Sequence, residues 1–449
     1  MSTNQLDPDI EAAVNPRPSS GSTERVADQP SSEVEPDELR AFLVRLGAAL
    51  NAIGEPVYSI QERLERVAAA NGVSGARISA FPTSLFTSLG DGKPATIEPT
   101  SPLDATARLD QIAALDRLGD DAEKKAVPPA DGLRRLDEIR SLPPRFGPVL
   151  STAGYAVITV GIALILHPAA RDIAAAAAFG TIVGILRQLS QGRRTLQVLM
   201  PVVAAFCISA LTALAVEHGL ADPGLSAMIA SLIVFVPGAA LTTAVLELSA
   251  GEMIAGSSRL VWAGMHLGLL AFGILAGVEA VGIPSQRAFS STDPLLGPWA
   301  AWLGVLVYAV GTFVSHSAPR GSFWGLLIVL GAAWVGQIAG NELFGAYASG
   351  LVGGLVMTAV AALVSRLPSG MPVYASFLPG FWLLVPGSLS LIGLTQIAAG
   401  TDGALNETIA AGGSIVSVAL GVLCGTQLTQ WAATRRSAPR RGTAQPPSG

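Results

Sequence analysis

The chain has 449 residues, of which 50% are hydrophobic and 14% are charged, and its formal net charge is −5. Soluble proteins usually carry about 25% charged residues, so this composition excludes an ordinary soluble enzyme. The acidic balance and the lack of a basic stripe exclude a nucleic-acid-binding protein. Only Cys207 and Cys424 occur, both in apolar stretches, which excludes a disulfide framework or a thiolate metal cluster.

Charge is distributed unevenly along the chain. Residues 1–147 contain 23 acidic and 16 basic side chains, whereas residues 148–449 contain 10 acidic and 12 basic ones. This difference predicts that the first third lies in water and the remainder in lipid. All four histidines follow residue 147, so the first third lacks both His and Cys. We therefore predict no catalytic residues, no metal site and no cofactor.

The first third divides into a tail and a domain. Residues 1–36 are rich in Pro, Ser and acidic residues and are predicted to be disordered. Residues 37–147 are predicted to form a small α+β cytoplasmic domain. Its elements are a helix from an N-cap at Asp37, a helix over 56–71, strands over 76–81, 84–89 and 95–98, and charged helices within 104–141. Gly90-Asp91-Gly92 is interpreted as a hairpin turn, because the spacing of a phosphate loop is absent.

Ten apolar runs of membrane-spanning length follow, and a basic tail over 433–449 is predicted to be disordered. The runs are 148–167, 172–187, 195–216, 225–247, 260–282, 299–318, 323–338, 343–364, 372–397 and 408–431. With the N-terminus inside, the inner segments contain 14 arginines and the outer ones 2. The positive-inside rule therefore predicts a multi-pass protein of the cytoplasmic membrane with both termini in the cytoplasm.

The runs repeat with an offset of 149 residues, which places Val236-Pro237-Gly238 on Val385-Pro386-Gly387. Each half contains five runs, and five is odd, so the second half enters the membrane from the opposite side. The fold class is therefore a polytopic α-helical membrane protein with ten transmembrane helices in two inverted five-helix repeats, 148–282 and 299–432. Five glycine pairs are typical of close helix packing, namely Gly180/Gly184, Gly273/Gly277, Gly336/Gly340, Gly350/Gly354 and Gly421/Gly425.

Pro237 and Pro386 lie near the middle of the fourth and ninth runs. Proline followed by glycine predicts a broken helix, whose new N-terminus presents free N–H groups to a carboxylate. Pro379-Gly380 adds a second break to the ninth run. The predicted substrate-binding residues are Pro237, Gly238, Thr242, Thr243, Pro386, Gly387, Ser388 and Ser390. The alternative is that the prolines only kink packed helices and the hydroxyls cap the freed N–H groups.

Ionisable side chains within the runs form a second group of candidates. Glu247 and Glu279 are predicted proton carriers, because a desolvated carboxyl group titrates closer to neutrality. Glu252, Arg259 and His266 are further candidates for proton coupling or gating. The alternative is an interfacial position or a simple salt bridge, such as one between Glu252 and Arg259.

These motifs, in this order, resemble those of the threonine/serine exporter family over residues 37–432. The resemblance rests on Gly47, Gly54-Glu55-Pro56-Val57, Gly72, Phe81-Pro82-Thr83, Val236-Pro237-Gly238-Ala239-Ala240-Leu241-Thr242-Thr243, Gly251-Glu252, Gly256-Ser257-Ser258-Arg259, Phe377-Leu378-Pro379-Gly380 and Leu384-Val385-Pro386-Gly387-Ser388. It implies a ten-span exporter of small hydroxy amino acids driven by the proton gradient. Some relatives with split halves are linked to dicarboxylate export, and the N-terminal domain of the family has been suspected of hydrolase activity.

The leading hypothesis is a secondary transporter, not an enzyme, that exports threonine, serine or similar amino acids by proton antiport. Its partners are then a small amino acid, protons and the lipid bilayer, and a homo-oligomer is compatible with the sequence. Two alternatives remain. A dicarboxylate exporter shares the architecture and needs extra cationic contacts, and a membrane-anchored hydrolase needs catalytic groups in a domain without His or Cys.

Overall fold

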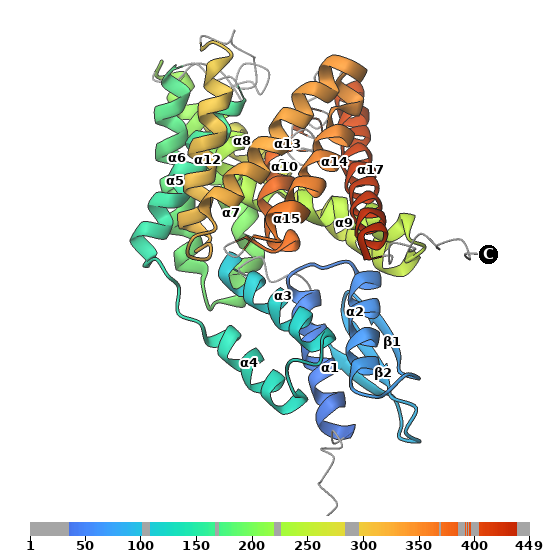
Figure 1. The fold of residues 1–449 in the computed structure, drawn as a ribbon. Helices are drawn as coiled ribbons and strands as arrows, with labels where there is room; N and C mark the ends of the chain where they lie inside the picture. Colours follow the sequence, from blue (N-terminus) through green and yellow to red (C-terminus); the bar gives the residue numbers. More distant parts are fainter. Residues whose placement is uncertain are drawn as a thin grey trace, which may run out of the picture.

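The computed structural model describes residues 36–100, 108–166, 170–219, 226–282, 296–367, 370–384, 391, 393, 395–396 and 404–437. Within these ranges the chain forms an N-terminal region (residues 36–147) that lies against one end of a bundle of apolar helices, the membrane region (residues 148–437) (Figure 1). Of the predicted tails, residues 1–35 and 438–449 lie outside the described residues, whereas residues 433–437 belong to the last helix.

The N-terminal region has the predicted helices and strands. They are α1 (Pro36–Ala52), α2 (Val57–Ala70), β1 (Arg77–Phe81), β2 (Ser84–Ser88), β3 (Thr96–Pro99), α3 (Leu109–Glu123) and α4 (Pro129–Ser141). The strands form an antiparallel sheet in the order β1-β2-β3, with Phe81 opposite Ser84 and Thr87 opposite Thr96. The apolar positions of α1 and α2 are buried against this sheet. One detail of the prediction is wrong: α1 begins at Pro36, so Asp37 lies in the first turn, where it pairs with Arg40 and Lys93.

The membrane region consists of α5 (Pro148–Ile165), α6 (Ala170–Ser190), α7 (Arg194–Glu217), α8 (Ser226–Leu232), η1 (Ile233–Phe235), α9 (Gly238–Ser249), α10 (Met253–Val281), α12 (Trp299–Ser315), α13 (Phe323–Phe344), α14 (Ala346–Val364), α15 (Val373–Leu383) and α17 (Ala404–Ser437). Among the described residues, six helices are long and apolar enough to cross a membrane, or seven if the bent pair α8–α9 is one span. Three shorter apolar helices lie within α12, α14 and α15. Each predicted run overlaps one of these helices.

Glycines bring the membrane helices into close contact, as predicted for all five pairs. In α5 and α12, Gly154 lies against Ser315 and Gly161 against Tyr308, so these helices run antiparallel. By contrast, α7 runs parallel to α10 and α14 runs parallel to α17. In each pair, the residue numbers of the contacting positions increase in the same direction along both helices. At these sites a Cβ would collide with neighbouring backbone, so only glycine permits the approach.

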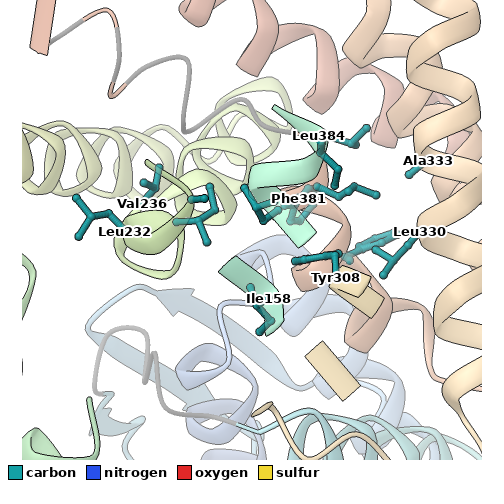
Figure 2. Close-up of a cluster of buried hydrophobic side chains, with 14 of the residues drawn as sticks. Ile158, Leu232, Val236, Tyr308, Leu330, Ala333, Phe381 and Leu384 are labelled. Carbon is teal, nitrogen blue, oxygen red and sulfur yellow. The ribbon is translucent and has the colours of Figure 1, made fainter. Parts of the chain in front are cut away.

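A buried core joins the first and second halves of the membrane region. Figure 2 shows Ile158 and Tyr308 near Phe381 and Leu384 at the end of α15. Two buried tyrosines donate hydrogen bonds into this core. Tyr155 of α5 donates to the Ser231 carbonyl at 2.7 Å, and Tyr308 of α12 donates to the Pro379 carbonyl at 2.8 Å.

The N-terminal region and the membrane region share their apolar cores. Leu109 and Ile112 of α3 belong to the core of the membrane region, and Ala255 of α10 belongs to the core of the N-terminal region. The Leu109 N–H donates to the carbonyl of His316 at 2.9 Å. The two regions are therefore docked by apolar packing and by backbone hydrogen bonds.

Candidate functional site

The fourth predicted run is broken, as expected, at Pro237. Helix α8 with η1 ends at Phe235, α9 begins at Gly238, and the two segments are bent by 57°. Val236 is extended and Pro237 occupies the N-cap position of α9. Proline has no N–H to continue the helix, so the chain restarts as a new helix at this point.

The first turn of α9 presents backbone N–H groups. The Gly238 N–H is used, because it donates to the Val236 carbonyl at 2.8 Å, and no side chain of the described residues caps the helix. In the described part of the chain, the N–H groups of Ala239 and Ala240 donate to no backbone carbonyl and no side chain. Such N–H groups, with the positive end of the helix dipole, favour an anion.

These two residues line a small cavity between α9 and α15. The cavity has a volume of about 20 Å³. Its walls are Ala239, Ala240 and Thr243 of α9, Arg259 of α10, four residues of α15, and Ile53 and Gly54 of the N-terminal region. A space of this size holds about one water molecule, whereas pockets for small ligands measure roughly 300–1,000 Å³. The structure is therefore closed at this point.

The two predicted threonines differ in position. Thr243 lines the cavity, whereas the Thr242 hydroxyl donates to the Gly238 carbonyl at 3.0 Å within the helix. The Thr242 hydroxyl therefore neither faces the cavity nor caps a freed N–H group, and of the two threonines only Thr243 lines the cavity.

Glu247 and Arg259 form a buried ion pair beside the cavity. Glu247 is fully buried, Arg259 is 5% exposed, and the Arg259 Nε lies 3.0 Å from the nearer carboxylate oxygen. The suggested pair of Glu252 with Arg259 is wrong: Glu252 is partly exposed and occupies the N-cap of α10. Glu247, in the last turn of α9, is the residue whose carboxylate reaches the Arg259 guanidinium.

The ion pair is bonded to the loop that joins α1 and α2. Glu247 Oε1 accepts a hydrogen bond from the Val57 N–H at 3.1 Å. Arg259 Nη2 donates to Asn51 Oδ1 at 3.2 Å and lies 3.5 Å from the Glu55 carbonyl oxygen. We name residues 51–57 the docking loop. It closes the cavity on the side of the N-terminal region.

Local sequence shapes the docking loop. Gly54 has a φ of +90°, which favours glycine, and Pro56 precedes the first turn of α2. The Tyr374 hydroxyl of α15 donates to the Ile53 carbonyl at 3.3 Å. Burial raises the pKa of the Glu55 carboxyl, and the nearby Arg63 guanidinium opposes that rise. Sequence reasoning did not predict that the docking loop contacts the membrane region, although the motif Gly54-Glu55-Pro56-Val57 marks this loop.

The remaining candidates lie elsewhere. His266 stacks on Trp262 and lies at the backbone of Phe235, beside the break. Glu279 is exposed near the far end of α10 and away from the cavity-lining residues. In the ninth run the break expected at Pro379-Gly380 is wrong, because α15 continues through Pro379 and ends at Leu383. Pro386, Gly387, Ser388 and Ser390 lie outside the described residues.

Comparison with known families identifies the chain. A family described as "Putative threonine/serine exporter" matches residues 41–281, which is more than half of the chain. The chain belongs to this family. The match includes the docking loop, the break at Pro237 and the Glu247–Arg259 pair, whereas the α15 wall of the cavity lies beyond the matched residues.

Curated relatives are distant fungal proteins. The chain is 25% identical to pheromone-regulated membrane protein 10 of Yarrowia lipolytica, over 78% of this chain and 30% of that protein. It is 24% identical to an uncharacterized protein of Schizosaccharomyces pombe, over 78% of this chain and 48% of that protein. The chain thus matches less than half of the length of these relatives. No solved structure matches.

Proposed function

We propose that this member of the threonine/serine exporter family moves threonine, serine or a similar small amino acid out of the cell in exchange for protons. The observation that carries the proposal is the N-terminus of α9, whose uncapped Ala239 and Ala240 N–H groups line a cavity shared with α15. A helix N-terminus of this kind is suited to the carboxylate of an amino acid. The Thr243 hydroxyl would contact the other polar groups of the substrate.

The proposed architecture is ten spans in two inverted repeats. Antiparallel packing of α5 on α12 is what an in-plane two-fold relation requires of the first helix of each repeat. The parallel pairs α7/α10 and α14/α17 stand at corresponding positions of the two halves. The two buried tyrosines support the same relation, because each donates to a carbonyl five or six residues before the valine of a Val-Pro-Gly tripeptide.

The second break is proposed at Pro386, with Gly387, Ser388 and Ser390 contributing a matching N-terminus. α15, which leads to this tripeptide, already supplies part of the cavity wall opposite α9. The two half-helices would then present their N–H groups to one substrate between them, as discontinuous helices of secondary transporters do.

Protons and the docking loop would control access to the cavity. Protonation of Glu247 would remove the charge that holds Arg259 and would weaken the bond to the Val57 N–H. The docking loop would then be free to leave the cavity, which is too small for an amino acid as it stands. In this arrangement the N-terminal region is the cytoplasmic gate, and both termini are in the cytoplasm.

Counterflow in proteoliposomes tests the proposal. Labelled threonine, serine and succinate are exchanged at several pH gradients. We expect exchange of threonine or serine that depends on the gradient, and faster exchange of succinate would instead identify a dicarboxylate exporter. Thr243→Val should weaken exchange, and Thr242→Val is the matched control, because the Thr242 hydroxyl is bonded inside the helix.

A further inference from the structure

Arg187 occupies an unusual position near the end of α6. Gly184 packs on Thr152 and Gly180 on Thr159, so α6 runs antiparallel to α5. The Arg187 guanidinium carbon lies 5.2 Å from the centre of the Tyr155 ring, which is buried in the bundle. A helical side chain leans toward the N-terminus of its helix. Arg187 is therefore directed back into the bundle, not outward beyond the end of α6.

The charge of Arg187 is not balanced. Within the described ranges, no carboxylate pairs with Arg187 and its side-chain nitrogens donate no hydrogen bond, in contrast to Arg259. Arg187 is only partly exposed. The Tyr155 ring contributes roughly 0.5–2 kcal/mol through its π face, which offsets part of the cost of partly desolvating the cation. An arginine with only a structural role at a helix end would extend to the surface.

Further polar groups surround this cation. His316 lies within electrostatic range of Arg187, is 6% exposed, and its Nδ1 has no hydrogen-bond partner. The His316 ring lies 5.1 Å from that of Trp382 on α15, and the preceding residue, Phe381, lines the cavity. Arg187 provides positive charge and N–H groups, and His316 provides a ring nitrogen without a partner among the described residues. Tyr155 contributes only its ring face, because its O–H is donated to the Ser231 carbonyl.

We propose that Arg187, supported by Tyr155 and His316, binds the carboxylate of a small solute at a second station beside α15. The ligand class rests on the proposed function, because the geometry itself specifies only an oxyanion. The planar guanidinium matches a carboxylate with two parallel hydrogen bonds. The 149-residue offset places Arg187 one position before Gln337 in the second half. Gln337 is uncharged, and its side chain donates to the Leu384 carbonyl at 3.3 Å. One charged station suits a solute with one carboxylate.

Ligand-dependent thermal unfolding of the purified full-length protein tests this station directly. The probes are threonine, succinate and threonine amide, which lacks the carboxylate. In Arg187→Gln, we expect the threonine concentration for half-maximal stabilisation to rise about 10- to 100-fold, the loss of one charge-assisted contact. Arg187→Lys should lose less. Arg193→Gln is the matched control, because Arg193 is exposed just beyond α6, and it should leave the value unchanged.

The analogue separates binding from folding. Arg187→Gln should leave the weak response to threonine amide unchanged. An equal loss for threonine and threonine amide would overturn the proposal, as would a wild-type value in Arg187→Gln or no stabilisation of the wild type by either carboxylate. Stabilisation that requires anionic lipid and ignores threonine would also overturn it. Normal stabilisation with no counterflow in the wild type would support the station and remove the exporter function.

Discussion

The two halves of the membrane region, which we propose to be repeats of one scaffold, differ in charge. The first half carries the buried Glu247–Arg259 pair beside its broken helix, whereas the 149-residue offset places Gln396 and Thr408 at these positions in the second half. Both halves use a buried tyrosine to bond a carbonyl before the Val-Pro-Gly tripeptide. The common features hold the helices in place. The charged pair belongs to one half and contacts the docking loop, so control by protons is expected from that half.

Restoring a continuous helix across the fourth run, which removes the break at Pro237, should have the largest effect on export. The variant Pro237→Ala with Gly238→Ala permits helical backbone through the 57° bend. We expect export to be abolished while membrane insertion and expression persist. Efflux from intact cells measures the first and fractionation of membranes the second. Efflux at the wild-type rate would remove α9 from the binding site.

Breaking the buried pair should have the next largest effect. Glu247→Gln or Arg259→Gln leaves one buried charge without its partner, which typically costs about 3–5 kcal/mol of stability. Thermal unfolding in detergent measures the loss. Glu252→Gln is the matched control, because Glu252 is partly exposed, and its change should stay within about 0.5 kcal/mol. Equal effects of Glu247→Gln and Glu252→Gln would contradict the pairing.

The shared feature of the halves predicts equal and smaller effects. Tyr155→Phe and Tyr308→Phe each remove one buried hydrogen bond to a carbonyl. Each variant should lose about 1–3 kcal/mol, because the carbonyl is left unsatisfied. The same unfolding measurement applies. A large loss in one variant with none in the other would argue against corresponding roles in the two halves.

The docking loop predicts a modest dependence on pH. Burial raises the pKa of Glu55, with Arg63 opposing and Asp116 and Glu123 adding to the rise. The folded protein therefore keeps the Glu55 carboxyl protonated at a pH where the same group in the unfolded chain, with a pKa of about 4.3, has released its proton. Stability from this group is complete below the unfolded pKa and is lost as pH rises through the folded one. Glu55→Gln should flatten this part of the profile of melting temperature against pH.

Sequence alone predicted the helices and strands well, for identifiable reasons. The apolar spacing of α1 and α2 and the runs of the membrane region are local signals, and Pro237 breaks its helix through its own covalent structure. Sequence could not show which carboxylate pairs with Arg259, because Glu247 and Glu252 are both near it in the chain. The conformation of the turn after α9 determines that Glu247 reaches the guanidinium. The contact between Val57 and Glu247 spans 190 residues. No local pattern encodes a pairing across that distance.

The central claim is that the docking loop closes the cavity at the interrupted helix, and that this cavity opens for the solute. The most direct test measures access to the cavity. Ala240→Cys is placed in a chain with Cys207→Ser and Cys424→Ser, and its labelling by a membrane-impermeant thiol reagent is followed in inside-out vesicles. We predict slow labelling of the closed protein and a clear rise with threonine or after Glu247→Gln. Rapid labelling from the start, or slow labelling that neither condition changes, would contradict the account.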